Sequence, residues 1–213
     1  RPEIPAPSRI THGEAQAYEG RFLTTRRAYG GLEGFIDRLI GEATVRAAPD
    51  GRLALTIDGK SSQWTATDQP DTFAPTSGAG LLVFQREDGK VARFFSPIGG
   101  AAFERIDFPH QRSLLTTFAV LAALAALATL VGVATRDRRE ARQTPTQARA
   151  SLLQTIQAIL WLVALVGVGV FASGADDMAR AFYGWPSGWL LSASACAFVA
   201  TLLTIATLAM LPV

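Results

Sequence analysis

The sequence is poor in the residues that build covalent and metal-bound sites. It contains one cysteine, Cys196, and two histidines, His12 and His110, among 213 residues. A single cysteine excludes an intramolecular disulfide and any metal site that needs two or more thiolates from this chain. His12 lies in a proline-rich stretch and His110 lies beside a long apolar run, so neither is placed to activate a serine nucleophile. The acidic residues are spread through expected turns and strand ends, so we predict no metal, no cofactor and no catalytic residue in this chain.

The chain also lacks a strong net charge. Its formal charge is +2, from 20 Lys and Arg residues and 18 Asp and Glu residues, and the basic residues form no patch interleaved with aromatic side chains. Both features argue against nucleic acid as a partner. The charges are unevenly placed, because 28 of these 38 residues lie in residues 1–112. Such a split is incompatible with a single soluble globular domain.

Charge is absent from three long apolar runs in the second half of the chain. Residues 113–135, 150–175 and 181–213 contain no Asp, Glu, Lys or Arg. A helix needs about 20 apolar residues to cross the hydrocarbon core of a bilayer. Glycine and proline around position 186 disfavour an earlier start of the last helix, so we predict transmembrane helices over residues 113–135, 150–175 and 187–211. A soluble helical core is the disfavoured alternative, because its helices rarely lack charge on every face.

The two connections between these spans differ in charge. Residues 136–149 hold five arginines against two acidic residues, whereas residues 176–186 hold a single arginine. Arginine-rich loops stay in the cytoplasm, so residues 1–112 and the second connection are expected on the opposite side. The excess of Arg over Lys, 18 to 2, and the absence of Asn are typical of a GC-rich bacterial genome. We therefore predict a multi-pass protein of the bacterial inner membrane whose first half is periplasmic. The expected anchors at the membrane interface are Tyr183, Trp185, Trp189, Arg136, Arg138, Arg139 and Arg142.

No Asp, Glu, Lys, Arg or His lies inside the expected spans. Ionisable groups are the usual working parts of pumps and proton relays, so these helices are expected to act as an anchor. Small residues spaced by four allow helix backbones to approach closely in lipid, either within one chain or in an oligomer. The small residues are Ala119, Ala122, Ala123, Ala126, Gly167, Gly169, Ser173, Ser192, Ala193, Cys196, Ala197 and Ala200.

The first half of the chain is patterned as a small β domain. Three prolines mark residues 1–15 as a semi-rigid linker. Residues 16–108 contain six or seven short strand-like segments separated by turn signals, of which Asp50-Gly51 and Asp88-Gly89 are the strongest. Residues 32–40 instead place apolar side chains at helical spacing. We predict a small, mostly antiparallel β domain, a meander or barrel with one short helix covering an opening, followed by three transmembrane α-helices.

Aromatic side chains on the expected strands allow two interpretations. They either form the core of the domain or line a pocket for an apolar ligand, and the core is the commoner place for aromatic strand residues. The residues in question are Trp64, Phe84, Phe94, Phe95 and Phe103.

Four segments of the first half resemble a known family. They are YEGRFLTTRRAY (Tyr18–Tyr29), VRAAPDGRLAL (Val45–Leu55), LVFQREDGKV (Leu82–Val91) and FERIDF (Phe103–Phe108). These segments resemble the carboxy-terminal part of bacterial membrane-bound serine hydrolases of the β-lactamase-related family, which includes class C β-lactamases and penicillin-binding-protein-like esterases. In that family a catalytic domain precedes a small β domain and several transmembrane helices. The resemblance covers residues 18–213 approximately.

The catalytic motifs of that family are absent from this sequence. The family uses a Ser-x-x-Lys nucleophile, a Tyr-x-Asn element and a Lys-Thr-Gly-like strand. Lys60 and Lys90 are the only lysines, neither follows a serine by three residues, and the chain has no asparagine. The resemblance therefore implies a catalytic domain upstream of Arg1 or on a separate chain. We also expect both ends of the sequence to continue in a longer protein.

These inferences combine into one prediction and one alternative. The prediction is a noncatalytic membrane-anchoring and accessory region of a periplasmic-facing serine hydrolase that acts on ester, amide or peptidoglycan-type substrates. Its expected partners are membrane lipid and the serine-hydrolase catalytic domain. The alternative is a stand-alone membrane-tethered β domain that binds a lipid, a wall fragment or a partner subunit. An enclosed apolar cavity or a continuous exposed apolar patch would favour the alternative.

Overall fold

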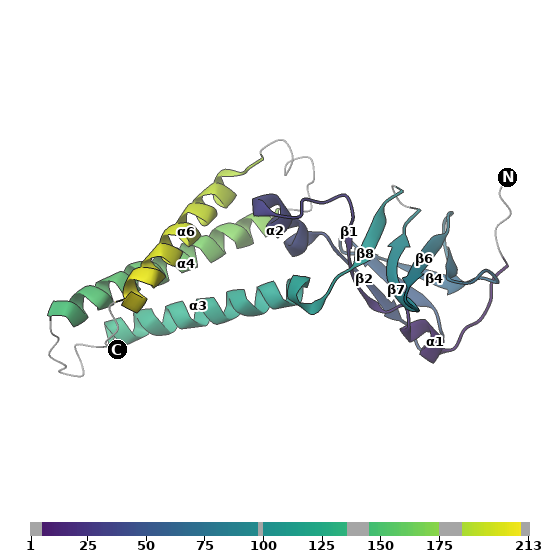
Figure 1. Cartoon of the computed structure of the whole chain (residues 1–213), viewed down its shortest axis with the longest axis horizontal. Coiled ribbons are helices and arrows are strands. Elements are labelled where there is room, and N and C mark those ends of the chain that lie inside the picture. The colour runs from purple at the N-terminus through teal and green to yellow at the C-terminus, as the bar shows by residue number, and fades with distance from the viewer. Residues whose placement is uncertain (1–5, 98–99, 136–144, 175–184, 210–213) are drawn as a thin grey trace. The chain divides into compact units, whose positions relative to one another are not determined.

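The computed structural model describes residues 6–97, 100–135, 145–174 and 185–209, with no side chain described at position 146. The chain divides into two compact units, Arg1–Leu114 and Leu115–Val213. The first unit is a β-barrel with short helices, and the second consists of long helices (Figure 1).

The first unit is a closed barrel of eight antiparallel strands. Each strand pairs with the next one along the chain, and β8 pairs with β1 to close the barrel. The predicted antiparallel barrel is thus confirmed, with one strand more than the sequence indicated. The additional strand is β5, which has four residues and ends at a proline. The strands are β1 (Gly20–Thr24), β2 (Glu42–Ala47), β3 (Leu53–Ile57), β4 (Lys60–Ala66), β5 (Thr72–Pro75), β6 (Leu82–Glu87), β7 (Lys90–Phe95) and β8 (Ala102–Arg105).

Tight turns set the register of the barrel. Asp58-Gly59 joins β3 to β4 with φ values of 49° and 72°, and Asp88-Gly89 joins β6 to β7 with φ values of 50° and 76°. Two-residue hairpin turns of this kind need a positive φ at both central positions, which Asp and Gly tolerate. The hairpins predicted at Asp50-Gly51 and Asp88-Gly89 are both present.

Aromatic side chains fill the barrel. The ring of Phe94 stacks on that of Phe103 at 4.7 Å between centroids and meets the edge of Phe22 at 4.9 Å. Phe84 continues the cluster toward Phe73, 5.5 Å away. Trp64, Phe84, Phe94 and Phe103 are therefore core residues, whereas Phe95 is 43% exposed on the outer face.

Two short helices accompany the strands. Helix α1 (His12–Gln16) starts with a capping box between Thr11 and Glu14, and it delivers Ala15 to the core. Helix α2 (Gly31–Ile40) links β1 to β2 and confirms the amphipathic helix predicted there. Within the described part of the chain, however, the barrel core includes no residue of α2. Helix α1 therefore supplies the helical contribution to the core, and the short helix predicted over residues 32–40 is present as α2.

The described part of the expected linker is bound to the barrel. Pro7 forms a β-bridge with Thr67. The backbone N–H of Ser8 donates to the Ala66 carbonyl at 2.8 Å, and the N–H of Asp68 donates to the Ala6 carbonyl at 2.9 Å. Residues 6–8 therefore lie along the end of β4 instead of forming a free spacer.

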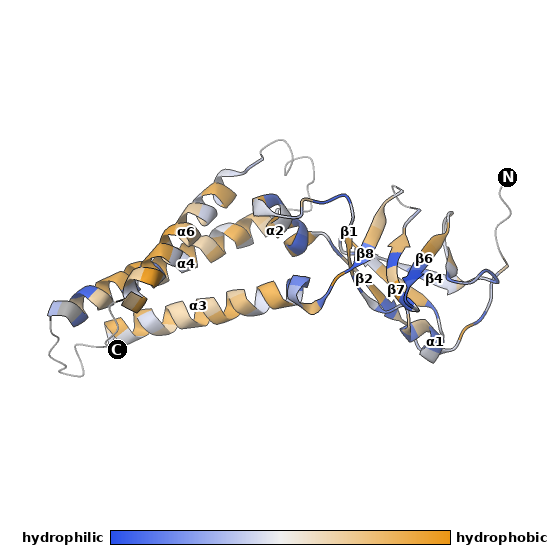
Figure 2. Cartoon of the chain, viewed as in Figure 1, coloured by the Kyte–Doolittle hydropathy of each residue, from blue (hydrophilic) through white to orange (hydrophobic). Residues whose placement is uncertain are grey.

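The second unit contains three helices that are long and apolar enough to cross a membrane. They are α3 (Arg112–Ala134), which begins in the first unit, α4 (Pro145–Ser173) and α6 (Gly188–Ala209). Figure 2 shows that apolar residues dominate all three. Helix α4 begins at Pro145, inside the stretch predicted as a loop, because proline is favoured in the first turn of a helix. The protein is therefore membrane-associated.

Helices α4 and α6 form an antiparallel pair with small residues at the contact. A Cβ atom placed on Gly167 would lie 3.0 Å from the Ala193 Cβ and 3.1 Å from the Trp189 carbonyl oxygen. Ala193 and Ala200 are buried on α6. These three positions belong to the small residues from which close helix packing was predicted.

Candidate functional site

The two histidines lie apart from each other, in α1 and in η1 (Phe108–His110). The Nδ1 atom of His12 lies 3.0 Å from the Ala48 carbonyl, and its Nε2 atom lies 3.1 Å from the Gln16 side-chain amide. His12 thus ties α1 to the turn after β2, and His110 is exposed in η1. Among the described residues, no group of three or more His, Cys, Asp and Glu side chains could hold a metal ion.

A polar cluster lies where α1 meets the barrel. The Tyr18 hydroxyl donates to the Asp71 carboxylate at 2.7 Å, and Arg86 Nε donates to the same oxygen at 2.9 Å. The Arg86 guanidinium also lies 5.0 Å from the centroid of the Tyr18 ring. Burial, together with the hydrogen bond to Asp71, raises the pKa of the Tyr18 phenol above its ordinary value. The phenol is therefore held in its neutral form, where it fixes α1 to the β4–β5 turn.

This cluster predicts a loss of stability at alkaline pH. A raised phenol pKa stabilises the fold fully below the unfolded value of about 10, and this contribution disappears as the pH rises through the folded value. Tyr18→Phe is expected to lower the free energy of unfolding by about 1 kcal/mol at neutral pH, because Asp71 keeps Arg86 as a partner. The variant is also expected to lose less stability than the parent above pH ~10. Thermal unfolding of the full chain in detergent between neutral and alkaline pH measures both effects.

The control for this prediction is Tyr29→Phe, since the Tyr29 side chain is largely exposed. Its free energy of unfolding at neutral pH should stay within about 0.5 kcal/mol of that of the parent chain. Equal losses at neutral pH for the Tyr18 and Tyr29 variants would contradict the assignment.

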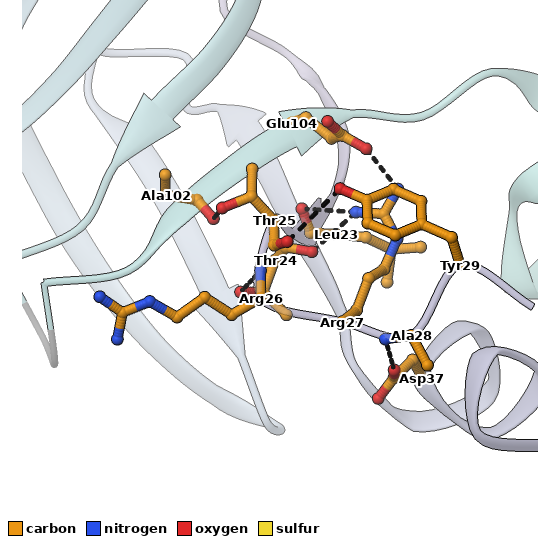
Figure 3. Close-up of polar contacts among 10 residues, drawn as sticks. All are labelled: Leu23, Thr24, Thr25, Arg26, Arg27, Ala28, Tyr29, Asp37, Ala102 and Glu104. Carbon is orange, nitrogen blue, oxygen red and sulfur yellow. Dashed lines mark hydrogen bonds and ion pairs between the residues drawn. The ribbon is translucent and has the colours of Figure 1, made fainter.

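A second polar cluster joins α2 to the barrel (Figure 3). The Arg27 guanidinium forms an ion pair with Glu104 on β8, donates to the Thr24 carbonyl at 2.7 Å and lies 4.6 Å from the centroid of the Tyr29 ring. The carboxylate of Asp37 on α2 accepts a hydrogen bond of 3.0 Å from the Ala28 N–H. Every charged group in this cluster is engaged with the chain itself, so the cluster is a joint between α2 and the strands.

Glu42, the first residue of β2, connects this region to the start of α3. Its side chain is only 5% exposed and forms an ion pair of 2.6 Å with Arg21. The other carboxylate oxygen accepts the backbone N–H of Arg112 at 2.8 Å. Because both oxygens have a donor, Glu42 holds the beginning of the first apolar helix against the barrel.

The predicted interface anchors are only partly described. Trp185 packs edge-on against Phe171 at 6.2 Å between centroids, and Trp189 is exposed in the first turn of α6. The two tryptophans thus lie at the end of the α4–α6 pair where α4 ends and α6 begins. The remaining predicted anchors lie outside the described residues: Tyr183, Arg136, Arg138, Arg139 and Arg142.

A polar link between α4 and α6 was missed from the sequence. The Gln157 amide donates to the Thr204 hydroxyl at 2.9 Å and accepts from the Thr207 hydroxyl at 3.3 Å. Polar side chains of this kind hold transmembrane helices together. The signal in the sequence was a pair of glutamines three positions apart in an apolar run, which a search for ionisable residues overlooks.

A groove of about 380 Å³ adjoins this link in the second unit. Its polar lining consists of hydroxyl, amide and indole groups, from Thr129, Gln154, Gln157, Trp161, Thr204 and Thr207. None of these groups titrates near neutral pH, so the lining offers hydrogen bonds and no proton transfer.

The comparisons with known proteins add no relative. Neither a family model, nor a curated protein, nor a solved structure matches this chain. The resemblance to β-lactamase-related serine hydrolases therefore remains a prediction, and the described structure establishes a closed eight-stranded barrel joined to three apolar helices.

Proposed function

We propose that this chain is a noncatalytic membrane anchor and accessory region. It holds a β-barrel, whose interior is filled by side chains, on the extracytoplasmic face of a bacterial inner membrane. The observation that carries the proposal is the pairing of a filled barrel with three membrane-length helices. The proposed contribution of the chain is to hold a linked domain at the membrane surface. Tethering confines a linked domain to a thin layer and raises its effective concentration for substrates of the envelope.

The side of the membrane rests on the distribution of arginine. Residues 136–149 hold five arginines and residues 176–186 hold one, which favours a cytoplasmic first connection. Helix α3 precedes that connection, so the barrel before it lies on the opposite side. The Trp185 and Trp189 pair adjoins the second connection, where aromatic side chains favour the headgroup layer.

The filled interior bears on what the barrel binds. The interior positions that a small apolar ligand would need are occupied by rings in mutual contact. A lipid-carrying barrel is therefore disfavoured, and the outer surface is left for contacts with a partner domain. The partner that we propose, from the resemblance of the four segments in the first half, is a serine hydrolase of the β-lactamase-related family, either joined to this chain or bound to it.

One experiment tests the location and the partner together. Lys60 is exposed on β4, so it is replaced by cysteine in a chain that also carries Cys196→Ser. This variant is expressed in its natural length in a bacterial host. Spheroplasts are treated with a membrane-impermeant biotin-maleimide, and the captured protein is then treated with a fluorophosphonate probe for active serines. We expect labelling without permeabilisation and a probe-reactive serine in the captured material.

The matched control is Gln143→Cys in the same Cys196→Ser background, within the connection predicted to be cytoplasmic. It should react only after permeabilisation. Labelling of Lys60→Cys only after permeabilisation would reverse the proposed topology. Absence of any probe-reactive serine would disprove the hydrolase association while leaving the anchor.

A further inference from the structure

Helix α2 carries an apolar face that the barrel core does not use. We call Leu32, Phe35, Ile36, Leu39 and Ile40 the apolar face of α2; all five lie within one arc when residues are placed about 100° apart around the helix. Ile36 is buried, and the other four are partly exposed. Within the described part of the first unit, none of them belongs to the barrel core.

The opposite side of α2 is the side that attaches to the loop between β1 and α2. A Cβ atom on Gly34 would lie 2.8 Å from the Ala28 carbonyl oxygen, so the helix backbone touches the loop there. The Asp37 carboxylate binds the N–H of the same residue, as Figure 3 shows. On a helical wheel Gly34 lies about 170° and Asp37 about 130° from the centre of the apolar face. The attachment therefore turns the apolar face away from the loop that holds it.

Arg112, the first residue of α3, binds the carboxy-terminal end of α2. Arg112 is the last charged residue before the uncharged run of α3. Its guanidinium donates to the Leu39 carbonyl at the end of α2 at 3.3 Å, and its N–H donates to Glu42. An arginine that ends an apolar span lies at the headgroup level. Because Arg112 is hydrogen-bonded to Leu39, the carboxy-terminal end of α2 is expected close to the headgroups. The whole helix is about 15 Å long.

The surroundings of α2 have the composition of a membrane interface. Tyr29, just before α2, is 66% exposed, and Phe108, just before α3, is 64% exposed. Arg26 is exposed and points away from the joint in Figure 3, and Arg38 lies beside the apolar face on α2. Aromatic side chains and arginines of this kind favour the headgroup layer and its phosphates.

From these observations we infer that α2 is an interfacial helix. Its apolar face is buried in the lipid at the boundary between headgroups and acyl chains, parallel to the surface of the membrane that α3 enters. Helix α2 is then a membrane contact of the first unit in addition to the α3 span. The inference rests on α3 being a span, and it is independent of the side of the membrane and of the partner.

Site-directed spin labelling of the full chain in vesicles tests the inference. Cys196→Ser removes the single native thiol, and Phe35→Cys, Leu39→Cys, Glu33→Cys and Phe118→Cys are introduced one at a time. The vesicles contain phosphatidylcholine with a minor fraction of phosphatidylglycerol. The accessibility of each label to oxygen, which concentrates in lipid, is compared with its accessibility to a water-soluble nickel chelate.

We expect labels at Phe35 and Leu39 to have an oxygen-to-nickel ratio several-fold above that at Glu33, which is exposed about 90° from the centre of the apolar face. A low ratio at Phe35 and Leu39, equal to that at Glu33, would overturn the inference. Protection from both reagents would overturn it as well, because the face would then be covered by protein. Phe118 lies within α3 and is exposed, so a low ratio there would refute the membrane anchor itself.

A second measurement needs no substitution in α2. Trypsin releases residues 28–38 as one peptide, because Arg27 and Arg38 bound it. A phospholipid with a photoactivatable group near the headgroup should crosslink to this peptide in the unmodified chain. The peptide around Lys60, on the exposed start of β4, should remain unlabelled. Equal labelling of the two peptides would overturn the inference.

Discussion

Replacing Phe94 by alanine is expected to cause the largest loss of stability in the barrel. The side chain is fully buried on β7, and its ring contacts those of Phe22, Phe84 and Phe103. Removing a buried phenylalanine leaves a cavity that the surroundings fill only in part, at a cost of about 4 kcal/mol. For a domain of this size the loss lowers the melting temperature by roughly 20 °C. Thermal unfolding of the full chain in detergent measures it, and amide exchange assigns the loss to the strands.

The neighbouring residue supplies the control for Phe94. Phe95→Ala makes the same change one position along the strand, where the side chain points outward and is partly exposed. Its expected cost is about 1 kcal/mol or less. A shift of one residue in strand register exchanges the inner and outer faces of a strand. If Phe95→Ala proved the more damaging change, the register of β7 would differ from the one described.

Gly51→Ala is expected to release the segment of residues 6–11 from the barrel. Gly51 has a φ of +82°, and a Cβ atom there would lie 2.0 Å from the carbonyl oxygen of Ile10. That oxygen belongs to the backbone, so the clash is relieved only if the segment moves. The left-handed conformation costs about 1 kcal/mol with alanine, and the hydrogen bonds of Ser8 and Asp68 add about 1 kcal/mol each, for a total of about 3 kcal/mol. Melting temperature and amide exchange at Ser8 report the two parts of this effect.

Gly89→Ala separates the two contributions. Gly89 has a φ of +76°, but no atom lies within 4 Å of the position of its Cβ. This variant should lose about 1 kcal/mol from backbone strain alone and keep the exchange protection of Ser8. Equal losses in the two variants would mean that contact with Ile10 contributes nothing, and that the amino-terminal segment is not held by this turn.

The architecture followed from the sequence where the signals were local. Alternating apolar residues with Asp-Gly turns predicted the antiparallel strands, because a hairpin is specified by residues close in sequence. Uncharged runs predicted the three apolar helices for the same reason. Strand β5 escaped notice, since four residues between Pro70 and Pro75 give too little alternation. Helix α1 was also missed, although Thr11 and Glu14 form a capping box that signals a helix start.

The sites depended on contacts between distant segments and were harder to predict. The ion pair of Arg27 with Glu104 forms only when β8 meets β1, and no spacing in the sequence announces it. The link from Gln157 to Thr204 and Thr207 requires the antiparallel packing of α4 on α6. The inside and outside of β7 also depend on register, which is why Phe94 and Phe95 could not be separated beforehand.

The order of the strands makes one pairing different from the others. Seven neighbouring pairs join strands that follow each other in sequence, so they form as local hairpins or after one short helix. The eighth pair, which brings Phe22 beside Arg105, must close nearly the whole domain into a ring and is expected late in folding. The ion pair of Arg27 with Glu104 and the hydrogen bond from the Thr25 hydroxyl to the Ala102 carbonyl stabilise this seam between β1 and β8. Because β8 is also the strand that leads into α3, tension applied through the membrane helix would act first on the last seam to close.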